Sequence, residues 1–344
     1  MKTIFVGTAR SYTIKIGSGL LADTGQEVCA LGGVRRVCVV SDSNVWPLYG
    51  EAVKQSLENA GFSAFSYVFP AGEQSKNGQT YLSLLQFLAE NGLTRQDLLL
   101  ALGGGVVGDL TGFAAATYLR GIRYIQVPTT VLSAVDSSVG GKTAIDLPAG
   151  KNLCGAFYQP SLVLCDTGTL NSLPPDIFRD GCAEVIKYGI LYDEGFFAYL
   201  EQTGTAFDRE RVIARCVELK RDVVLLDEQD NGARRMLNLG HTIGHALEAR
   251  SGFALSHGQA VAIGMAVVAR GTHCPDTRRI LDGLRRFGLP TAAAYPAEEL
   301  LPYTLSDKKR QEDAVALIVP RRVGHCEIVP TPVTELKKLM EEGL

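Results

Sequence analysis

Three of the five histidines in the chain, His241, His245 and His257, fall close together. His241 and His245 are four residues apart in the segment 238–250, which is rich in helix-forming residues and contains no proline. On a helix of about 3.6 residues per turn, both rings leave the same face. Two imidazoles on one face, with His257 on the loop before the apolar helical segment 260–269, can hold one divalent cation. The alternative is two core or capping histidines and one surface histidine, but the clustering of so scarce a residue favours the metal site.

A glycine-rich turn, GGGVVGD at residues 103–109, is the second candidate for chemistry. It has the spacing G-x-G-x-x-G, follows an apolar strand-like run and precedes a helical segment, which is the context of a dinucleotide-binding turn. Glycines there let the backbone approach a pyrophosphate, whose charge lies at the helix N-terminus. The carboxylate expected about 20 residues later is replaced by Arg120 and Arg123, and the carboxylate available at the same sheet edge is Asp42, beside Asn44. A tight turn without a ligand remains the alternative.

Basic residues that stand beside glycine, hydroxyl or carboxylate groups form a third set. The set comprises Arg120, Lys142, Lys151, Lys187, Lys220, Arg234, Lys308 and Lys309. Each alone is typical of a solvated surface, but a converging group suits a small substrate that carries a phosphate and a carboxylate. Glu184 and Lys187 are three residues apart in an apolar helical segment, so they share one face. Burying a carboxylate and an ammonium without partners is costly, so this pair also indicates a site.

Short strand-like runs alternate with helical segments in the first half of the chain. The predicted strands are residues 12–16, 34–41, 63–69, 97–102, 123–127 and 162–166, and the predicted helices among them are residues 45–60, 75–90 and 109–118. This alternation predicts βαβ units around a parallel sheet. After residue 173 the strand signals fade and helical patterns replace them. We therefore predict an α/β fold with a Rossmann-like parallel-sheet domain at residues 1–170 and a mostly α-helical domain at residues 171–344.

Composition limits the classes of function. A net charge of −3 argues against a nucleic-acid surface or a polybasic membrane patch, although it allows a local cationic pocket. The apolar runs are far shorter than the roughly 20 residues of a membrane span, and the first residues contain no apolar stretch of signal-peptide length. The eight cysteines are scattered without a C-x-x-C pair, as in reduced cytosolic proteins. We therefore expect a cytoplasmic protein with no nucleic-acid or membrane partner.

Seven motifs occur in a fixed order along the chain. They are GGGVVGD (103–109), PTT (128–130), AVDSSVGGKTAID (134–146), GKN (150–152), AEVIKYG (183–189), NLGHTIGHALEA (238–249) and HGQAVAIGM (257–265). Together they closely resemble the 3-dehydroquinate synthase family, and the string is far more specific than any one motif. The wider family includes sugar-phosphate cyclases that form other rings, and its fold is shared with metal- and NAD-dependent polyol dehydrogenases.

The resemblance implies two cofactors. A divalent metal, zinc or cobalt, would be held by Glu184, His241 and His257, whereas His245 would lie on the substrate side, near the phosphate. NAD would be bound by Asp42, Asn44, Glu73, Lys76, Gly104, Gly105, Val106, Asp109, Thr129, Thr130, Leu132, Lys142, Lys151, Thr169, Ser172 and Leu173.

The resemblance also implies a substrate cluster. Its members match Arg120, Asp136, Lys142, Asn152, Lys187, Lys220, Arg234, Asn238, His245 and Lys308. The chain departs from the family pattern at Asp230, where the family usually has Glu, and at Ser172, where Thr is common. Neither departure removes a functional group.

The activity implied is that of a carbon–oxygen lyase, a homodimer in the shikimate pathway of chorismate and aromatic amino acid biosynthesis. It would convert 3-deoxy-D-arabino-heptulosonate 7-phosphate, a phosphorylated sugar acid, to 3-dehydroquinate and phosphate by transient NAD oxidation, phosphate elimination, re-reduction and intramolecular aldol cyclisation. Two other hypotheses are a sister cyclase acting on a heptulose or glucose phosphate and an NAD-dependent polyol dehydrogenase. The residues Arg234, Asn238 and His245 match the dehydroquinate pattern and favour the first hypothesis, because the sister substrates lack the carboxylate.

Overall fold

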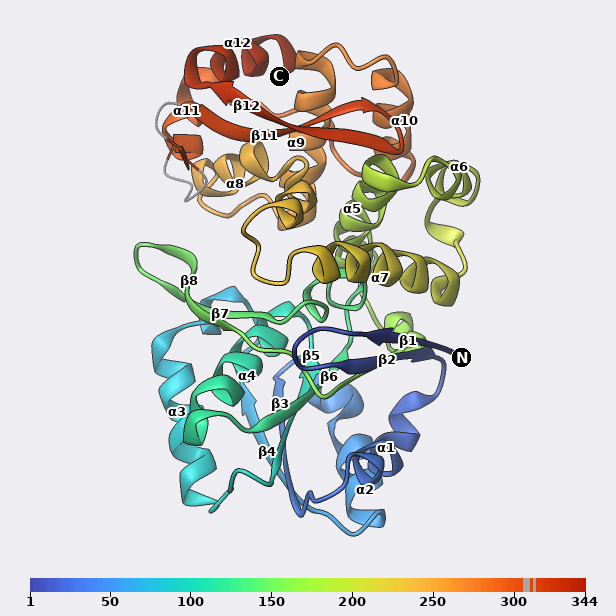
Figure 1. Cartoon of the computed structure of the whole chain (residues 1–344), viewed down its shortest axis with the longest axis vertical. Coiled ribbons are helices and arrows are strands. Elements are labelled where there is room, and N and C mark those ends of the chain that lie inside the picture. Colours follow the sequence, from blue (N-terminus) through green and yellow to red (C-terminus); the bar gives the residue numbers. More distant parts are fainter. Residues whose placement is uncertain (306–309, 312–313) are drawn as a thin grey trace. The chain divides into compact units, whose positions relative to one another are not determined.

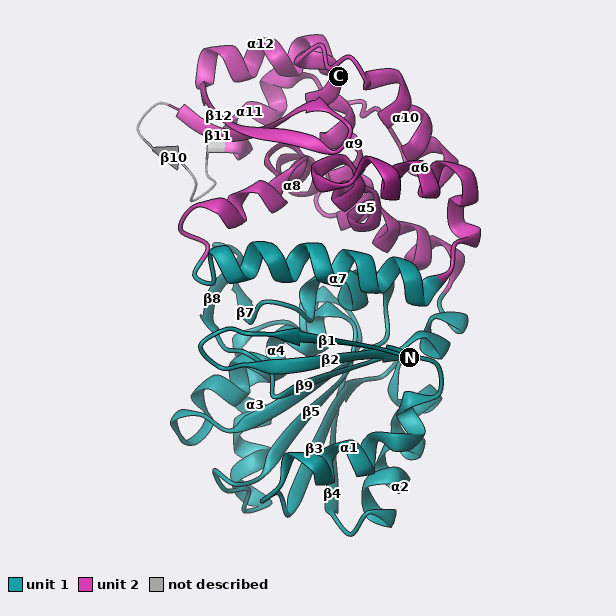
Figure 2. Ribbon diagram, turned by 45° about the vertical axis from the view of Figure 1, so that its right-hand side comes forward, with its two compact units in different colours: residues 1–173, 209–229 teal, residues 174–208, 230–344 magenta. Residues whose placement is uncertain are grey.

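The computed structural model describes residues 1–305, 310–311 and 314–344, which form two compact units (Figures 1 and 2). The first unit contains residues 1–173 and 209–229, and the second contains residues 174–208 and 230–344. The sequence predicts a single division after residue 170, and it does not predict the return of residues 209–229 to the first unit.

Among the described residues, the main sheet of the first unit has seven strands in the order β1-β2-β9-β6-β5-β3-β4. They are β1 (Lys2–Val6), β2 (Tyr12–Gly17), β3 (Arg36–Asp42), β4 (Ser63–Phe69), β5 (Leu98–Gly103), β6 (Arg123–Pro128) and β9 (Leu162–Asp166). All neighbouring strands pair in parallel except β1 and β2. The six predicted strands are confirmed. The edge strand β1 was missed because Ile4 and Val6 are its only buried residues.

Helices cover both faces of this sheet (Figure 1). On one face lie α1 (Thr24–Leu31) and α2 (Glu51–Asn59), and on the other lie α3 (Gly78–Glu90) and α4 (Gly105–Thr117). Alternate residues of a strand point to opposite faces. Val37 and Val39 of β3 therefore pack in the core with α1 and α2, whereas Cys38 and Val40 pack in the core with α3 and α4. Burial on both faces explains the continuous apolar sequence of β5, LLLALG.

The remaining elements of the first unit are short helical turns, a hairpin and one long helix. The turns are η1 (Leu20–Asp23), η2 (Trp46–Gly50), η3 (Glu73–Ser75), η4 (Tyr118–Arg120), η5 (Ser133–Ser137) and η6 (Thr167–Asn171). The hairpin consists of β7 (Lys142–Leu147) and β8 (Gly150–Phe157), and the long helix is α7 (Arg209–Leu226). Neither the hairpin nor its packing against α4 through Ile145 was predicted from the sequence.

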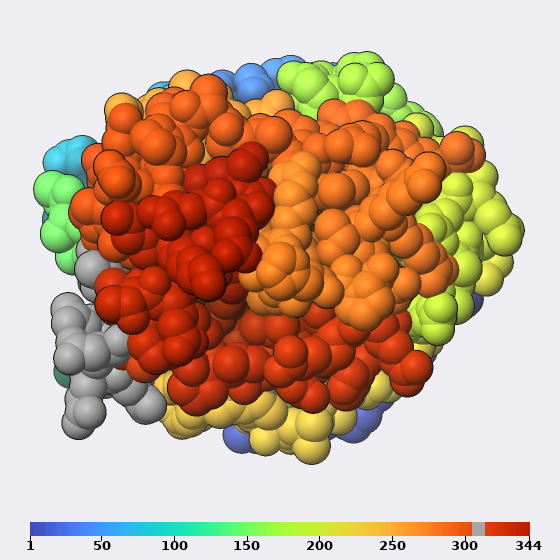
Figure 3. Space-filling view, turned by 90° about the horizontal axis from the view of Figure 1, so that it is seen from above, coloured from blue at the N-terminus to red at the C-terminus, as the bar shows by residue number. Residues whose placement is uncertain are grey.

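The second unit is mostly helical, as predicted. Its helices are α5 (Pro175–Tyr192), α6 (Glu194–Thr203), η7 (Gly204–Ala206), η8 (Ala233–Asn238), α8 (His241–Arg250), α9 (His257–Gly271), α10 (Thr277–Arg286), α11 (Ala297–Leu305) and α12 (Val333–Gly343). Helix α12 packs against α9, and Figure 3 shows the C-terminal residues, in the darkest red, exposed on one face of this unit. No helix in the described part of the chain is both long and apolar enough to cross a membrane.

The second unit also contains an antiparallel sheet, whose strands were not among those predicted from the sequence. Within the described ranges, its strands are β10 (Arg310–Gln311), β11 (Ala314–Arg322) and β12 (His325–Pro332). Leu317 and Val319 of β11 pack in one core cluster with Ile243 of α8 and Leu336 of α12. The sheet therefore supports the helices α8, α9 and α12 from one side, and it carries none of the predicted site residues.

Close contacts between helices in the second unit depend on glycine. A Cβ atom at Gly264 of α9 would lie 2.0 Å from the backbone oxygen of Gly240, the residue that precedes α8. A Cβ atom at Gly258 would lie 2.0 Å from the backbone oxygen of Asp180 in α5. Real Cβ atoms do not approach so closely, so these glycines allow α5, α8 and α9 to meet.

We expect Gly264→Ala to lower the free energy of unfolding by about 1–3 kcal/mol, because the added methyl group overpacks the contact with Gly240. Urea denaturation monitored by circular dichroism measures the change. Gly195→Ala in α6 is a matched control, since its Cβ atom would meet only Asp193 Oδ1, at 3.5 Å. The control should be neutral or more stable by roughly 0.5–1 kcal/mol. Equal stabilities of the two variants would contradict the packing argument.

Candidate functional site

Helix α5 carries an acidic and a basic side chain in the core of the second unit. Every residue from Gly181 to Leu191 is buried. Glu184 and Lys187 form an ion pair with side-chain exposures of 0% and 2%, which confirms that they share one face of the helix. The ammonium offsets part of the cost of burying the carboxylate.

Two helix starts bring histidines to this carboxylate. Helix α8 begins at His241, after Gly240, whose φ of 77° is a conformation that favours glycine. Helix α9 begins at His257, and Ser256 caps this end through a capping box. The hydroxyl of Ser256 also bonds to the carboxylate of Asp180, which ties the start of α9 to α5. The expectation that His257 lies on a loop was wrong, because the capping residue starts the helix three residues before the predicted apolar segment.

The three side chains meet at one carboxylate oxygen. Nε2 of His241 lies 3.3 Å from Oε1 of Glu184, and Nε2 of His257 lies 3.1 Å from the same atom. In a tetrahedral zinc site with bonds of about 2.1 Å, ligand atoms are about 3.4 Å apart. The observed spacing therefore fits a shared cation, and three protein ligands would leave a fourth position open, as in catalytic zinc sites.

The protonation of these groups also fits a cation site. Although burial opposes ionisation, Lys187 and His241 hold the pKa of Glu184 well below its ordinary value. Burial lowers the pKa of His241, which favours the neutral imidazole that binds metals. Burial would also lower the pKa of His257, but its contacts with Glu184 and Glu248 outweigh this and raise it to about 10.

Three further predicted residues lie in the second unit. The ring of His245 is 5.4 Å from that of His241 and 6.3 Å from that of His257, measured between centroids. The nitrogens of His245 do not belong to the group around Glu184, but to a second group with His257 and Glu248. Arg234 is buried in η8, at 2% exposure, and Nδ2 of Asn238 donates to the carbonyl of Arg235.

In the first unit, the glycine-rich turn and Asp42 lie side by side. The adjacent strands β3 and β5 pair with Ser41 opposite Leu102, so Asp42 is next to the residues that start the turn. The strand order reverses at this pair, and parallel sheets bind ligands at such switch points, at the carboxyl ends of the strands. Gly104 precedes the first residue of α4, which begins earlier than predicted, so the turn forms the helix N-terminus itself.

Other predicted cofactor residues follow neighbouring strands at the same edge. Thr129, Thr130 and Leu132 follow β6, and Thr169, Ser172 and Leu173 follow β9. The hydroxyl of Tyr49, which the sequence analysis did not single out, lies 2.6 Å from Oγ of Ser172 and donates to the carbonyl of Thr169 at 3.0 Å. Ser172, the departure from the family's usual Thr, therefore keeps a hydroxyl partner within its own unit.

Lys76 links residues that the resemblance assigned to different ligands. Its Nζ lies 2.6 Å from Oδ2 of Asp109 and 2.6 Å from Oδ1 of Asn152. Burial raises the pKa of Asp109, and contact with Asp109 raises the pKa of Lys76, although burial opposes that shift. Glu73 is 4.0 Å from the same ammonium. This network joins η3, α4 and the hairpin, and Asn152, with a φ of 55°, stands in β8 of that hairpin.

The remaining cations are spread more widely. Nζ of Lys220 on α7 lies 2.9 Å from Oδ1 of Asp136. Lys142 and Lys151 lie on the hairpin, at the start of β7 and in β8. Arg120 ends η4, just before β6, so it lies at the opposite edge of the sheet from the glycine turn. Lys308 lies outside the described residues.

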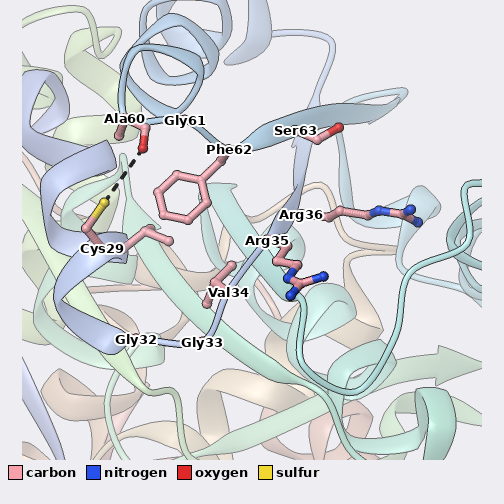
Figure 4. A pocket seen from close by; sticks show the side chains of 11 residues that line it. Cys29, Gly32, Gly33, Val34, Arg35, Arg36, Ala60, Gly61, Phe62 and Ser63 are labelled. Atoms are coloured by element: carbon pink, nitrogen blue, oxygen red, sulfur yellow. Dashed lines mark hydrogen bonds between the residues drawn. The ribbon is translucent and has the colours of Figure 1, made fainter.

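Two surface cavities lie at that opposite edge. The first, of about 530 Å³, is lined by residues that include Cys29, Arg35, Arg36 and Ser63 (Figure 4). The second, of about 500 Å³, is lined by residues that include Arg123. Arg36, Ser63 and Arg123 are the first residues of β3, β4 and β6, so these cavities face away from the predicted cofactor residues.

Comparison with known proteins agrees with these features. The family described as 3-dehydroquinate synthase N-terminal matches residues 66–180, and 3-dehydroquinate synthase C-terminal matches residues 181–310. The chain is 47% identical over 343 residues to the 3-dehydroquinate synthase of Pelobacter propionicus, with 96% of each chain covered.

Two solved structures of synthases are also similar to the chain. A 2-deoxy-scyllo-inosose synthase complexed with carbaglucose-6-phosphate, NAD⁺ and Co²⁺ has a TM-score of 0.89 and 26% identity over all of both chains. The 2-epi-5-epi-valiolone synthase of Streptomyces hygroscopicus, with NAD⁺ and Zn²⁺ bound, has a TM-score of 0.87 and 26% identity over 96% of this chain and 95% of that one. The family matches and the near-complete coverage show that the chain belongs to the 3-dehydroquinate synthase family.

Proposed function

We propose that this protein converts 3-deoxy-D-arabino-heptulosonate 7-phosphate to 3-dehydroquinate and phosphate, a step of the shikimate route to chorismate and aromatic amino acids. Membership of the family supports the proposal. The structural observation that supports it most is the convergence of Glu184, His241 and His257 on one point, with the spacing of a catalytic metal site.

We propose that these three side chains hold zinc or cobalt. A carboxylate and two imidazoles are a common ligand set for either ion, and the two similar synthases contain Co²⁺ and Zn²⁺. A bound cation with an open position polarises substrate hydroxyls and lowers their pKa. Oε1 of Glu184 faces both histidines while Oε2 pairs with Lys187, so the carboxylate can serve the cation and the lysine together.

NAD is proposed to bind at the carboxyl edge of the first unit's sheet. Gly104, Gly105 and Val106 place backbone N–H groups at the start of α4, where a pyrophosphate is stabilised, and Asp42 stands on the adjacent strand. Nicotinamide chemistry supplies reversible hydride transfer, so the overall reaction needs no other redox partner. Lys76 holds Asp109 and the hairpin residue Asn152 in place beside this helix.

The cationic residues are proposed to bind and orient the two anionic groups of the substrate. They are Lys142, Lys187, Lys220 and Arg234, with Asn152, Asn238 and His245 as hydrogen-bonding partners. Lys187, Lys220 and Arg234 are buried, so their charges are little screened by solvent. Holding the carboxylate and phosphate at fixed points keeps each intermediate in place for the next step.

Phosphate release from the seven-carbon acid phosphate, with NAD at catalytic concentration, is the direct test. We expect one phosphate per substrate and no accumulation of NADH. Phosphate release from glucose 6-phosphate or sedoheptulose 7-phosphate alone would instead assign a sister cyclase. Stoichiometric NADH would assign a polyol dehydrogenase. We also propose that the enzyme is a cytoplasmic homodimer, on the strength of the family resemblance, and sedimentation equilibrium measures the number of subunits.

His257→Ala should weaken zinc binding by about 100-fold while the fold is retained. Structural zinc sites with four ligands are worth about 10–16 kcal/mol, so one ligand contributes about 3 kcal/mol, or two powers of ten. Titration against a fluorescent chelator measures the affinity, and circular dichroism checks the fold. His325→Ala, at an exposed histidine of the same unit, is the control and should bind like the wild type. Unchanged affinity in His257→Ala would remove this residue from the site.

Lys187→Met should keep NAD binding but lower kcat by about 100- to 1000-fold, since it removes a preorganised charge from the substrate site while keeping a similar volume. Phosphate release gives kcat, and fluorescence titration gives the Kd of NAD. Lys337→Met, at an exposed position of α12, is the matched control. Wild-type turnover in Lys187→Met would contradict the role proposed for this lysine.

A further inference from the structure

A buried carboxylate that the sequence analysis did not single out lies next to the proposed metal site. Glu248 is on α8, seven residues after His241 and three after His245, and it is 5% exposed. An ionised carboxylate at this depth needs compensating partners. Its position on the same helix face as the two histidines directs it towards the start of α9.

Glu248 faces the nitrogen of His257 that the metal site does not use. Oε2 of Glu248 lies 3.7 Å from Nδ1 of His257, while Nε2 of that ring lies 3.1 Å from Glu184. The imidazole of His257 therefore lies between two carboxylates, with one nitrogen towards each. Both carboxylates are buried, at 0% and 6% side-chain exposure, so solvent screens these interactions weakly.

His241 shows the same arrangement with a different partner. Its Nδ1 lies 3.1 Å from the carbonyl oxygen of Leu239, and its Nε2 faces Glu184. A carbonyl oxygen can only accept a hydrogen bond, so Nδ1 of His241 carries the proton and Nε2 has the free lone pair. Both rings are thus oriented through Nδ1, one by the backbone and the other by a carboxylate.

We propose that Glu248 is a positioning residue for the metal site: its negative charge, 3.7 Å from Nδ1 of His257, favours the tautomer with the proton on Nδ1, whose Nε2 can bind the cation. This inference rests on the proposed metal site. Partners behind a metal-binding imidazole orient the ring and raise its basicity, and a carboxylate does both more strongly than a carbonyl. The added negative charge also favours a divalent cation nearby.

The alternative is that Glu248 binds an ion itself. His245, Glu248 and His257 offer ligand atoms within 4.8 Å of one another. The nitrogen of His257 that faces Glu248 is Nδ1, however, and a neutral imidazole has only one free lone pair. A second ion there would require His257 to lose both protons and bridge two cations. The positioning role needs no such step.

The test is zinc affinity in Glu248→Gln and Glu248→Ala, measured by chelator competition and by the number of ions bound per chain. We expect one ion per wild-type chain and an affinity about 10- to 100-fold weaker in Glu248→Ala. Glu248→Gln should lose less, because its amide oxygen still presents a partial negative charge to Nδ1. Glu201→Gln, at a carboxylate on α6 bonded to Arg279, is the control and should bind zinc as the wild type does.

Nitrogen NMR of the zinc-loaded protein reports the environment of Nδ1 in His257, and a general loss of stability would not change that signal selectively. We expect the Nδ1 signal of His257 to shift in both Glu248 variants, while the signals of His241 stay in place. If the wild type binds zinc and Glu248→Ala binds it with the same affinity, the positioning role alone is overturned. Two ions per wild-type chain, one of them lost in Glu248→Ala, would make Glu248 a ligand instead. Absence of zinc binding in the wild type would overturn the proposed metal site.

Discussion

The carboxylate of Glu184 is the group on which the site in the second unit depends. It is fully buried, and its charge is tolerated because one oxygen pairs with Lys187 while the other faces two imidazoles. The three neighbours come from the same helix and from the first residues of two others. Because those helices meet at glycines, backbone packing and electrostatics specify the same arrangement. The packing of the three helices thus makes this buried charge a candidate position for a cation.

In both units, candidate site residues lie at the ends of regular elements. In the first unit, parallel strands end at one edge, and the strand order reverses where Asp42 and the glycine turn are adjacent. In the second unit, His241 and His257 are the first residues of α8 and α9. A helix N-terminus carries partial positive charge, which favours neutral over protonated imidazoles and attracts nearby carboxylates. In the first unit, the partial positive charge at the start of α4 would stabilise an anion. In the second unit, the same charge at the starts of α8 and α9 opposes a cation, so buried carboxylates must offset it.

Much of this could be predicted from sequence, because strong local patterns coincide with the observed elements. Apolar runs located six strands, and clustered histidines pointed to the group of side chains that could hold a metal ion. The start of α9 at His257 was missed, since a capping serine outweighs the absence of apolar residues in the first turn. The contact of Lys76 with Asp109 and Asn152 joins residues far apart in the chain, so no local spacing could reveal it. Glu248, by contrast, was within reach, because it follows His241 by two helical turns.

The first unit is discontinuous in sequence, because the segment 209–229 belongs to it but follows residues 174–208 of the second unit. Asp136 is made early, whereas its partner Lys220 is made only after α5 and α6 of the second unit. During synthesis, the residues of the first unit are therefore complete only after residues 174–208 of the second unit have been made. Recombination between related genes is constrained in the same way. After a single crossover near residue 173, Asp136 and Lys220 would come from different parent genes. Exchange of the sheet-bearing unit as a whole would need two additional junctions, one on each side of α7.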